Sequence, residues 1–102
     1  MVLNTVSERV TSVAVMVTFT LKTDPATYEA LHSQMLALAI PAGMLFHSAH
    51  EADGQVGIVD FWPDDEVWSA FSRGPLAEGM KGAGIAPPDD LKVTPVLNAD
   101  SR

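Results

Sequence analysis

Two parts of the chain alternate between apolar and other side chains with a period of two, which is typical of β-strands that bury one face. In residues 13–21, one face collects five apolar side chains: Val13, Val15, Val17, Phe19 and Leu21. Further along, residues 44–50 and 56–62 flank Asp53-Gly54, and an Asp-Gly pair between two such runs is a strong signal for a tight hairpin turn. The pattern therefore predicts one strand and, later, a β-hairpin.

The hairpin turn fixes which side chains of its two strands lie side by side on one face. A turn centred on Asp53-Gly54 gives these facing pairs: His47 with Asp60, Leu45 with Trp62, Ala49 with Ile58, and Phe46 with Phe61. One face then carries an imidazole, a carboxylate and an indole, whereas the other carries Phe46, Ser48, Val59 and Phe61. We interpret the first face as a candidate site and the second as core.

Two segments have the spacing and the end signals of helices. Asp24-Pro25 supplies an N-cap followed by proline in the first turn, and large side chains recur at helical spacing to near Ala39: Tyr28, Leu31, Met35 and Leu38. Residues 63–66 place acids in the first turn of a second helix, whose inward stripe is Val67, Phe71 and Trp68. Gly74-Pro75 interrupts this second helix, and a short helical piece follows at residues 76–80.

The last part of the chain is predicted to be a loop and a strand. Residues 82–88 are rich in glycine and proline, which indicates a loop. Residues 91–97 form the closing strand, and Pro95 marks it as an edge strand.

The element order is strand, helix, strand, strand, helix, strand, which is typical of an α+β, ferredoxin-like βαββαβ domain with a four-stranded antiparallel sheet. We expect a single domain at residues 12–98, an N-terminal tail or added edge segment at 1–11, and a C-terminal tail at 99–102. Both helices should cover one sheet face, above Val15, Val17, Phe19, Phe46, Val59 and Phe61. The bare face should carry Met16, Thr18, His47, Asp60 and Trp62.

Composition bears on partners and location. With 47% hydrophobic residues and a mean hydropathy of +0.16, the 102-residue chain is more apolar than one small domain easily buries, which favours a homodimer. Its formal charge of −7 opposes binding to nucleic acid or to anionic membrane. No apolar run approaches the ~20 residues of a membrane span and no secretory signal is visible, so we expect a cytoplasmic protein.

His47 and Asp60 are the candidate catalytic pair, because a carboxylate that orients an imidazole raises its basicity. The alternative is a cross-strand polar pair that satisfies only itself. Trp62 is expected either to stack on a flat ligand or to pack at an interface. The further expected substrate contacts are Met16, Thr18, Leu45, Ala49 and Ile58.

Other candidates have plainer interpretations. His47 and His50 are three apart, so on a strand they point to opposite faces, and we expect no metal site. His32 is expected to be solvated. Trp68 and Phe71 are expected in the helix core. The glycines of residues 79–84 do not follow a strand and are not followed by the Gly-Lys-Ser/Thr ending of a phosphate-binding loop, so we expect a flexible linker or a lid over the cavity mouth there.

The segment 56–71, with Asp60 two residues before Trp62, an acidic helix start and the later aromatic Phe71, resembles the antibiotic biosynthesis monooxygenase-like proteins of the dimeric α+β barrel superfamily. The resemblance covers roughly residues 13–98. It implies two sheets joined face to face, with the bare face forming a ligand cavity. Haem-degrading members ligate iron with a histidine in the second helical region, and residues 64–86 contain none, so haem is not expected.

The resemblance and the residues together favour a small enzyme without a cofactor, monooxygenase-like or a cyclase or isomerase. It would act on a planar aromatic or polyketide-like molecule, with His47 as general base. The alternative is a non-catalytic dimer that binds a hydrophobic small molecule. The state of the His47–Asp60 pair discriminates between the enzyme and the binding protein. A histidine open to the cavity favours catalysis, and one covered by neighbouring side chains favours storage of a ligand.

Overall fold

The computed structural model describes residues 13–99. The elements in chain order are β1 (Val15–Leu21), α2 (Pro25–Ala42), β2 (Phe46–Ala52), β3 (Gln55–Trp62), α3 (Asp65–Phe71), the π-helical turn η1 (Ser72–Leu76), α4 (Ala77–Gly82) and β4 (Lys92–Pro95). The predicted segment 1–11 lies outside the described residues. Within those residues, no helix combines the length and the apolarity that a membrane crossing requires.

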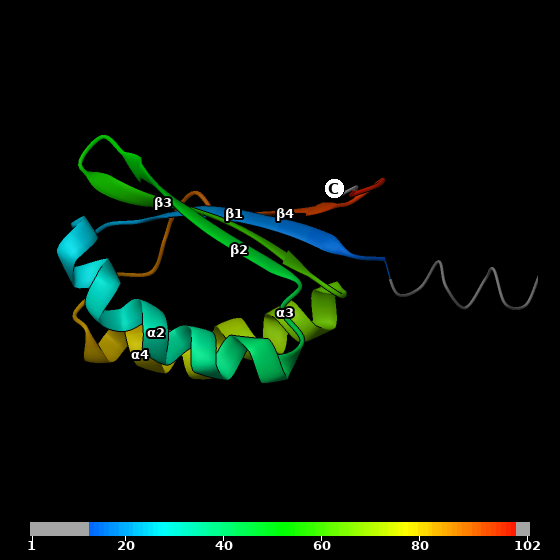
Figure 1. Cartoon of the computed structure of the whole chain (residues 1–102), viewed down its shortest axis with the longest axis horizontal. Coiled ribbons are helices and arrows are strands. Elements are labelled where there is room, and N and C mark those ends of the chain that lie inside the picture. The colour runs from blue at the N-terminus through cyan, green and yellow to red at the C-terminus, as the bar shows by residue number, and fades with distance from the viewer. Residues whose placement is uncertain (1–12, 100–102) are drawn as a thin grey trace, which may run out of the picture.

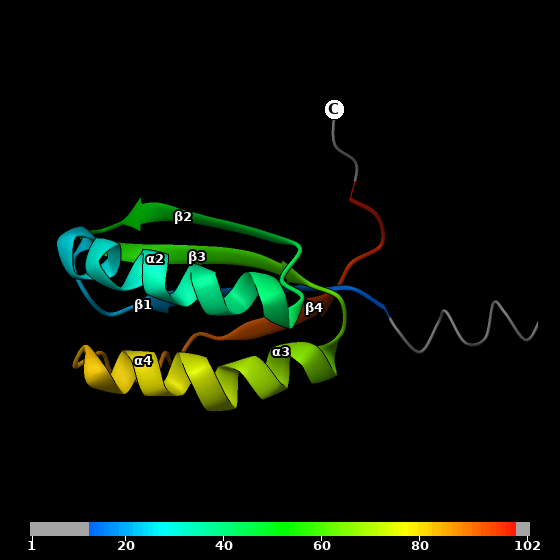
Figure 2. The same cartoon turned by 60° about the horizontal axis from the view of Figure 1, so that its bottom comes forward.

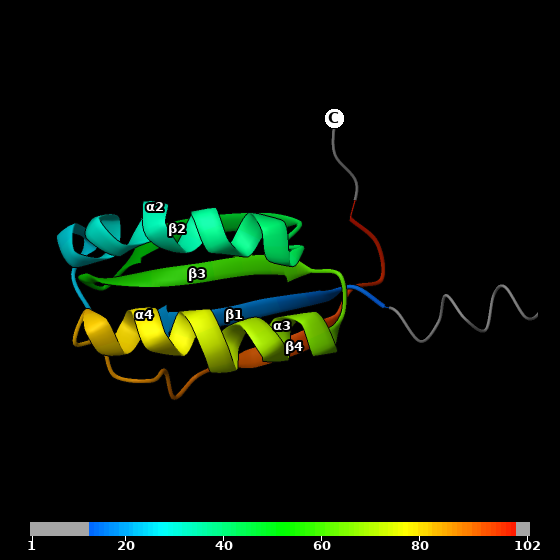
Figure 3. The same cartoon turned by 90° about the horizontal axis from the view of Figure 1, so that it is seen from below.

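The four strands form one antiparallel sheet in the order β2-β3-β1-β4, and all helices lie on one face of it (Figure 1). Seen from below, α2 covers β2 and β3, and the run from α3 to α4 covers β1 and β4 (Figure 3). The ferredoxin-like α+β prediction is therefore confirmed. Strand β4 is at the edge, as Pro95 indicates.

Helix α2 starts where the sequence predicts and ends later. The Asp24 side chain accepts a hydrogen bond of 2.8 Å from the Thr27 amide, the N-cap interaction that begins a helix. The helix continues past Ala39 to Ala42 and ends at Gly43, whose φ of 116° is readily adopted only by glycine. Leu38, one of the side chains that recur at helical spacing, is 47% exposed.

The second helical layer is one continuous run rather than two separate pieces. The Asp64 side chain caps α3 by accepting from the Val67 amide at 2.8 Å. At Gly74-Pro75 the chain does not break but widens into η1, which leads directly into α4 (Figure 2). A π-helical turn accommodates an extra residue within a helix, which explains how the run passes a proline without ending.

The hairpin register is confirmed, and Val15, Val17 and Phe19 lie under the helices as predicted, but the hairpin face assigned to the helices is wrong. His47 pairs with Asp60, as predicted, and β1 places Val17 on the other side of Asp60. The alternating apolar face of β1 is thus continuous with the face of His47, Asp60 and Trp62, and this combined face lies under the helices. Asp60, at 6% exposure, and Trp62, at 0%, are buried there.

The opposite, bare face carries the residues that alternate with these. They are Met16, Thr18, Phe46, Ser48, Val59 and Phe61. Met16 and Thr18 therefore do not share a face with His47, and Phe46, at 51% exposure, is not core. The polar pair is tolerated under the helices because its two members bond to each other, so burial leaves no unpaired charge.

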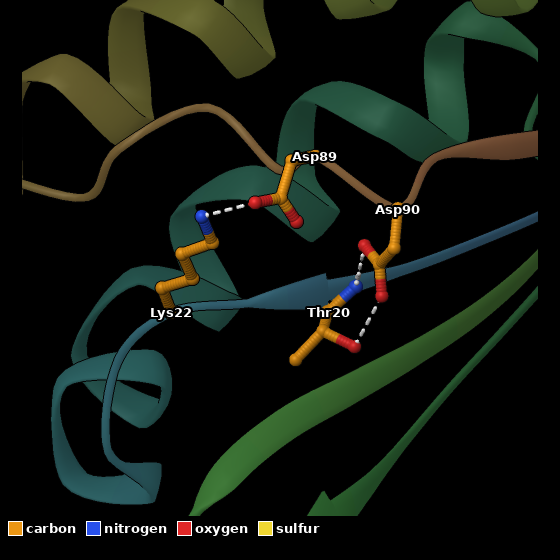
Figure 4. A network of polar contacts seen from close by, with 4 residues as sticks. All are labelled: Thr20, Lys22, Asp89 and Asp90. Atoms are coloured by element: carbon orange, nitrogen blue, oxygen red, sulfur yellow. Dashed lines mark hydrogen bonds and ion pairs between the residues drawn. The ribbon is translucent and has the colours of Figure 1, made fainter.

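The loop between α4 and β4 is fastened to the end of β1 by two side-chain contacts (Figure 4). The Asp90 carboxylate accepts from the Thr20 amide at 2.9 Å and from its hydroxyl at 2.7 Å. These bonds lower the pKa of Asp90. Beside them, Lys22 and Asp89 form an exposed ion pair of 2.7 Å. The loop is thereby held against the strand that carries Phe19.

Candidate active site

A small cavity of about 60 Å³ lies between helix α2 and the buried face of the sheet. Most of its lining is apolar, from α2, β1, β3 and the second helical run. Five lining residues carry polar groups: Tyr28, His32, His47, Asp60 and, through its indole N–H, Trp62. An apolar cavity with a few convergent polar groups is the usual form of a small-molecule site.

Three of these polar groups form a hydrogen-bonded chain. His47 Nδ1 lies 2.6 Å from Asp60 Oδ1, and His47 Nε2 lies 2.8 Å from the Tyr28 hydroxyl. Strands β2 and β3 supply the first two residues as a cross-strand pair, and α2 supplies the third from above. The order carboxylate, imidazole, phenol runs from the sheet toward the helix.

With Asp60 ionised and His47 neutral, the chemistry of these groups gives the direction of each bond. An ionised carboxylate only accepts, so His47 Nδ1 carries the hydrogen and donates to Asp60. In the neutral imidazole, Nε2 is then the acceptor, and the Tyr28 hydroxyl donates to it. A proton placed on the Tyr28 oxygen can therefore pass along the chain to His47, where Asp60 stabilises the resulting imidazolium.

The Tyr28 phenol is held in its protonated form. Burial raises its pKa to about 12, and the negative charges of Glu29 and Asp60 act in the same direction. Tyr28 is consequently suited to donating and relaying a proton, whereas a stable phenolate at this position is disfavoured.

His32, expected to be solvated, is instead half-buried beside this chain. Its ring centroid lies 5.2 Å from that of His47, with the planes 23° apart, and 5.3 Å from that of Tyr28. Sequence reasoning missed both α2 residues as parts of the site. The available signal was their spacing, because residues four apart lie on one helix face, here the face that also carries Leu31 and Met35.

Trp62 lines the cavity and is fully buried. Its ring packs against Phe71 and Trp68, with centroids 5.0 and 5.6 Å apart. Its indole Nε1 is buried and has no hydrogen-bond partner among the described residues. A buried donor without an acceptor is costly, so an oxygen atom in the cavity would be favourable to it.

The remaining predicted contacts divide between the cavity and the surface. Ile58 lines the cavity. Leu45, at 61% exposure, and Ala49, also exposed, do not line it, and Met16 and Thr18 lie across the sheet. Trp68 and Phe71 belong to the hydrophobic core, as predicted.

A metal site of protein ligands would need three or more histidine, cysteine, aspartate or glutamate side chains close together. Residues 13–99 contain no such group. His50 follows His47 on β2 but lies on the bare face, against Gly57 of β3.

Comparisons with known proteins test the fold. Neither a family model nor a curated protein matches the chain. Among solved structures, SnoaB, a cofactor-independent oxygenase from Streptomyces nogalater, matches with a TM-score of 0.62 and 14% identity over 86% of this chain and 95% of its own. A protein from Chloroflexus aurantiacus described as an antibiotic biosynthesis monooxygenase matches with a TM-score of 0.60 and 16% identity, over 86% of this chain and 97% of its own. The chain has the fold of the antibiotic biosynthesis monooxygenase-like proteins.

The same fold also occurs without an assigned activity. NE2512, a protein of unknown function from Nitrosomonas europaea, matches with a TM-score of 0.53 and 23% identity over 89% of this chain and 94% of its own. Shared architecture therefore leaves the activity of this monooxygenase-like fold to be argued from the side chains of the cavity.

Proposed function

We propose that this chain is a small enzyme that acts without a cofactor on a planar aromatic or polyketide-like molecule, and that it removes a proton from the group of that molecule that enters the cavity beneath α2. The observation that carries the proposal is the hydrogen-bonded chain Asp60–His47–Tyr28, which ends at the wall of an apolar cavity. His47 is the general base, Asp60 orients it, and Tyr28 relays the proton. The family resemblance and the fold of SnoaB agree with such chemistry.

The proposed step begins with a substrate hydroxyl or an acidic C–H next to the Tyr28 oxygen. As the substrate proton moves to that oxygen, the phenolic proton moves to His47 Nε2, so that Tyr28 stays neutral throughout, as its raised pKa requires. The resulting imidazolium is stabilised by Asp60. An oxygen of the substrate anion accepts a hydrogen bond from the indole N–H of Trp62.

The substrate determines what the anion does next. In the monooxygenase-like case, a CH₂ group flanked by aromatic rings reacts with dioxygen, becomes a carbonyl that keeps one oxygen atom, and releases the other as water. In the cyclase case the anion attacks a carbonyl of the same molecule. In the isomerase case the proton returns at another carbon.

Replacement of His47 tests the proposal, and the same strand offers a matched control. With an anthrone as substrate in air, we expect His47→Ala to lower kcat/KM by about 10²–10⁴-fold, the usual contribution of a general base. His50→Ala removes an imidazole from the opposite face and should leave the rate unchanged. Tyr28→Phe should also slow turnover, because the relay is lost. Equal rates for His47→Ala and His50→Ala would refute the mechanism.

A second candidate, a non-catalytic binding protein, is favoured by one feature of the site. Nε2 of His47 is covered by Tyr28, and the ring of His32 stacks on its face. A covered base suits storage of a ligand rather than turnover. Under this alternative, an apolar aromatic molecule binds with measurable affinity, is recovered unchanged after incubation in air, and binds equally to wild type and His47→Ala.

We propose further that the working form is a homodimer joined through the bare sheet face. This face offers exposed apolar side chains, led by Phe46, whose ring lies 5.6 Å from that of Phe61. Exposed apolar patches of this kind are typical of interfaces. Because the cavity lies on the other side of the sheet, each subunit would carry its own site.

A further inference from the structure

A second cavity of about 530 Å³ lies between β1, the α3–α4 run and the loop that Asp90 fastens to β1. Its walls are mostly apolar: Phe19, Trp68, Ser72, Leu76, Ala77, Met80, Ile85, Pro87, Pro88 and Leu91, with Lys81 as its charged member. None of the three members of the proton chain lines it. It is thus separate from the cavity beneath α2.

The two cavities share part of their walls. Phe19 and Leu76 line both. Behind them, Trp62 lines the first cavity and Trp68 the second, and these two rings are in contact with centroids 5.6 Å apart. The partition between the cavities is therefore made of apolar side chains.

Size makes this partition significant. A cavity of about 150 Å³ is known to bind benzene, whereas the first cavity measures only about 60 Å³. Small-molecule sites commonly measure about 300–1,000 Å³, a range that the second cavity reaches. A molecule of two or three rings therefore fits the second cavity, and touches the proton chain only where the partition opens.

Leu76 is the less buried of the two residues that line both cavities. Phe19 lies in β1, where it pairs with Ile58 and is 6% exposed. Leu76, by contrast, is half-buried and ends the π-helical turn η1. Open space lies beside Gly74 in the same turn, since nothing is within 4 Å of where a Cβ would lie. Turns of this type are frequent at functional sites.

We propose that Leu76 is a movable partition between the two cavities, and that the second cavity receives the ring system of the proposed planar aromatic substrate. Its hydroxyl or carbonyl end passes Leu76 and reaches Tyr28. The identity of that polar end rests on the proposed function, but the joined cavities and the role of Leu76 do not.

Calorimetric titration with 2-naphthol, a two-ring phenol, tests this proposal, with naphthalene as its hydroxyl-free counterpart. Leu76→Trp fills the passage and should weaken 2-naphthol binding at least about tenfold. Leu76→Ala enlarges the passage and should bind at least as tightly as wild type. Leu38→Trp, at an exposed position of α2 that lines neither cavity, should bind like wild type.

Circular dichroism verifies that each variant is folded, and Leu76→Phe replaces Leu76→Trp if the larger ring prevents folding. Wild type that fails to bind 2-naphthol, or Leu76→Trp that binds as well as Leu38→Trp, would overturn the partition. The second result would leave the proton chain intact. If Leu76→Trp weakens binding but Tyr28→Phe removes none of the preference for 2-naphthol over naphthalene, the partition stands and the proposed proton chain fails.

Discussion

The Tyr28 hydroxyl is the end of the proton chain that a substrate would meet, so its protonation state decides what the site can do. Burial raises its pKa to about 12, with Glu29 and Asp60 adding to the shift. A phenol that stays protonated donates a hydrogen bond to His47 at neutral pH, and leaves the oxygen lone pairs to receive a proton from the ligand. The residue thus connects the cavity to the imidazole without holding charge itself.

This shift is directly measurable because Tyr28 is the single tyrosine of the chain. Titration of its absorbance near 295 nm should give a midpoint at about 12 in the folded protein, against the ordinary value of 10.0. Asp60→Asn should lower the midpoint, because one negative charge is removed. A midpoint near 10 in samples that circular dichroism shows to be folded would contradict the buried position of the phenol.

The same shift makes a contribution to stability that depends on pH. The unfolded chain loses the phenolic proton near pH 10, whereas the folded chain keeps it to about pH 12. The contribution is therefore fully present below pH 10 and is lost as the pH rises from about 10 to about 12. Denaturant unfolding in this window should show a fall in stability that Tyr28→Phe diminishes.

At the scale of elements, local signals in the sequence determined the hairpin but not its orientation toward the helices. Asp53-Gly54 set the register, and His47 indeed pairs with Asp60. Which face the helices cover depends on how β1 pairs with β3, a contact between distant segments that no turn specifies. Because His47 and Asp60 are polar, the sequence suggested that their face of the hairpin is not covered by helices. Their mutual hydrogen bond, however, makes burial of both side chains under the helices tolerable.

The missing parts of the site have the same cause. Tyr28 and His32 share a helix face, but only the packing of α2 across β2 and β3 brings that face to His47 (Figure 3). Likewise, Gly74-Pro75 is a sequence that usually ends a helix. Here the chain continues through the wider turn η1, because the apolar residues Phe71 and Met80 on either side of it are buried in one core. Tertiary packing overrides the local signal in both cases.

At the scale of the whole molecule, the two faces of the sheet carry different side chains. The covered face holds the proton chain and the cavities, and the bare face carries exposed Phe46 and its neighbours. If subunits associate through the bare face, as proposed, mutations can alter association and the proposed chemistry independently.

Mass measurement by sedimentation or light scattering tests the dimer. Wild type should have about twice the chain mass of 10.9 kDa. Phe46→Asp places a charge on the bare face and should shift the protein toward monomer. Leu38→Asp is a matched control, because Leu38 is 47% exposed against 51% for Phe46 but lies on α2. A monomeric wild type, or equal effects of the two variants, would contradict association through this face.

The central claim is that Asp60 and Tyr28 hold His47 as one tautomer, with the hydrogen on Nδ1. Nitrogen NMR of the imidazoles at about pH 8, well above the ordinary histidine pKa of about 6.5, measures this directly. The three histidines are assigned with His32→Ala and His50→Ala. The account predicts a protonated Nδ1 and an acceptor Nε2 at His47, and a mixture of tautomers in Asp60→Asn. A hydrogen on Nε2, or a mixture in wild type, would contradict it.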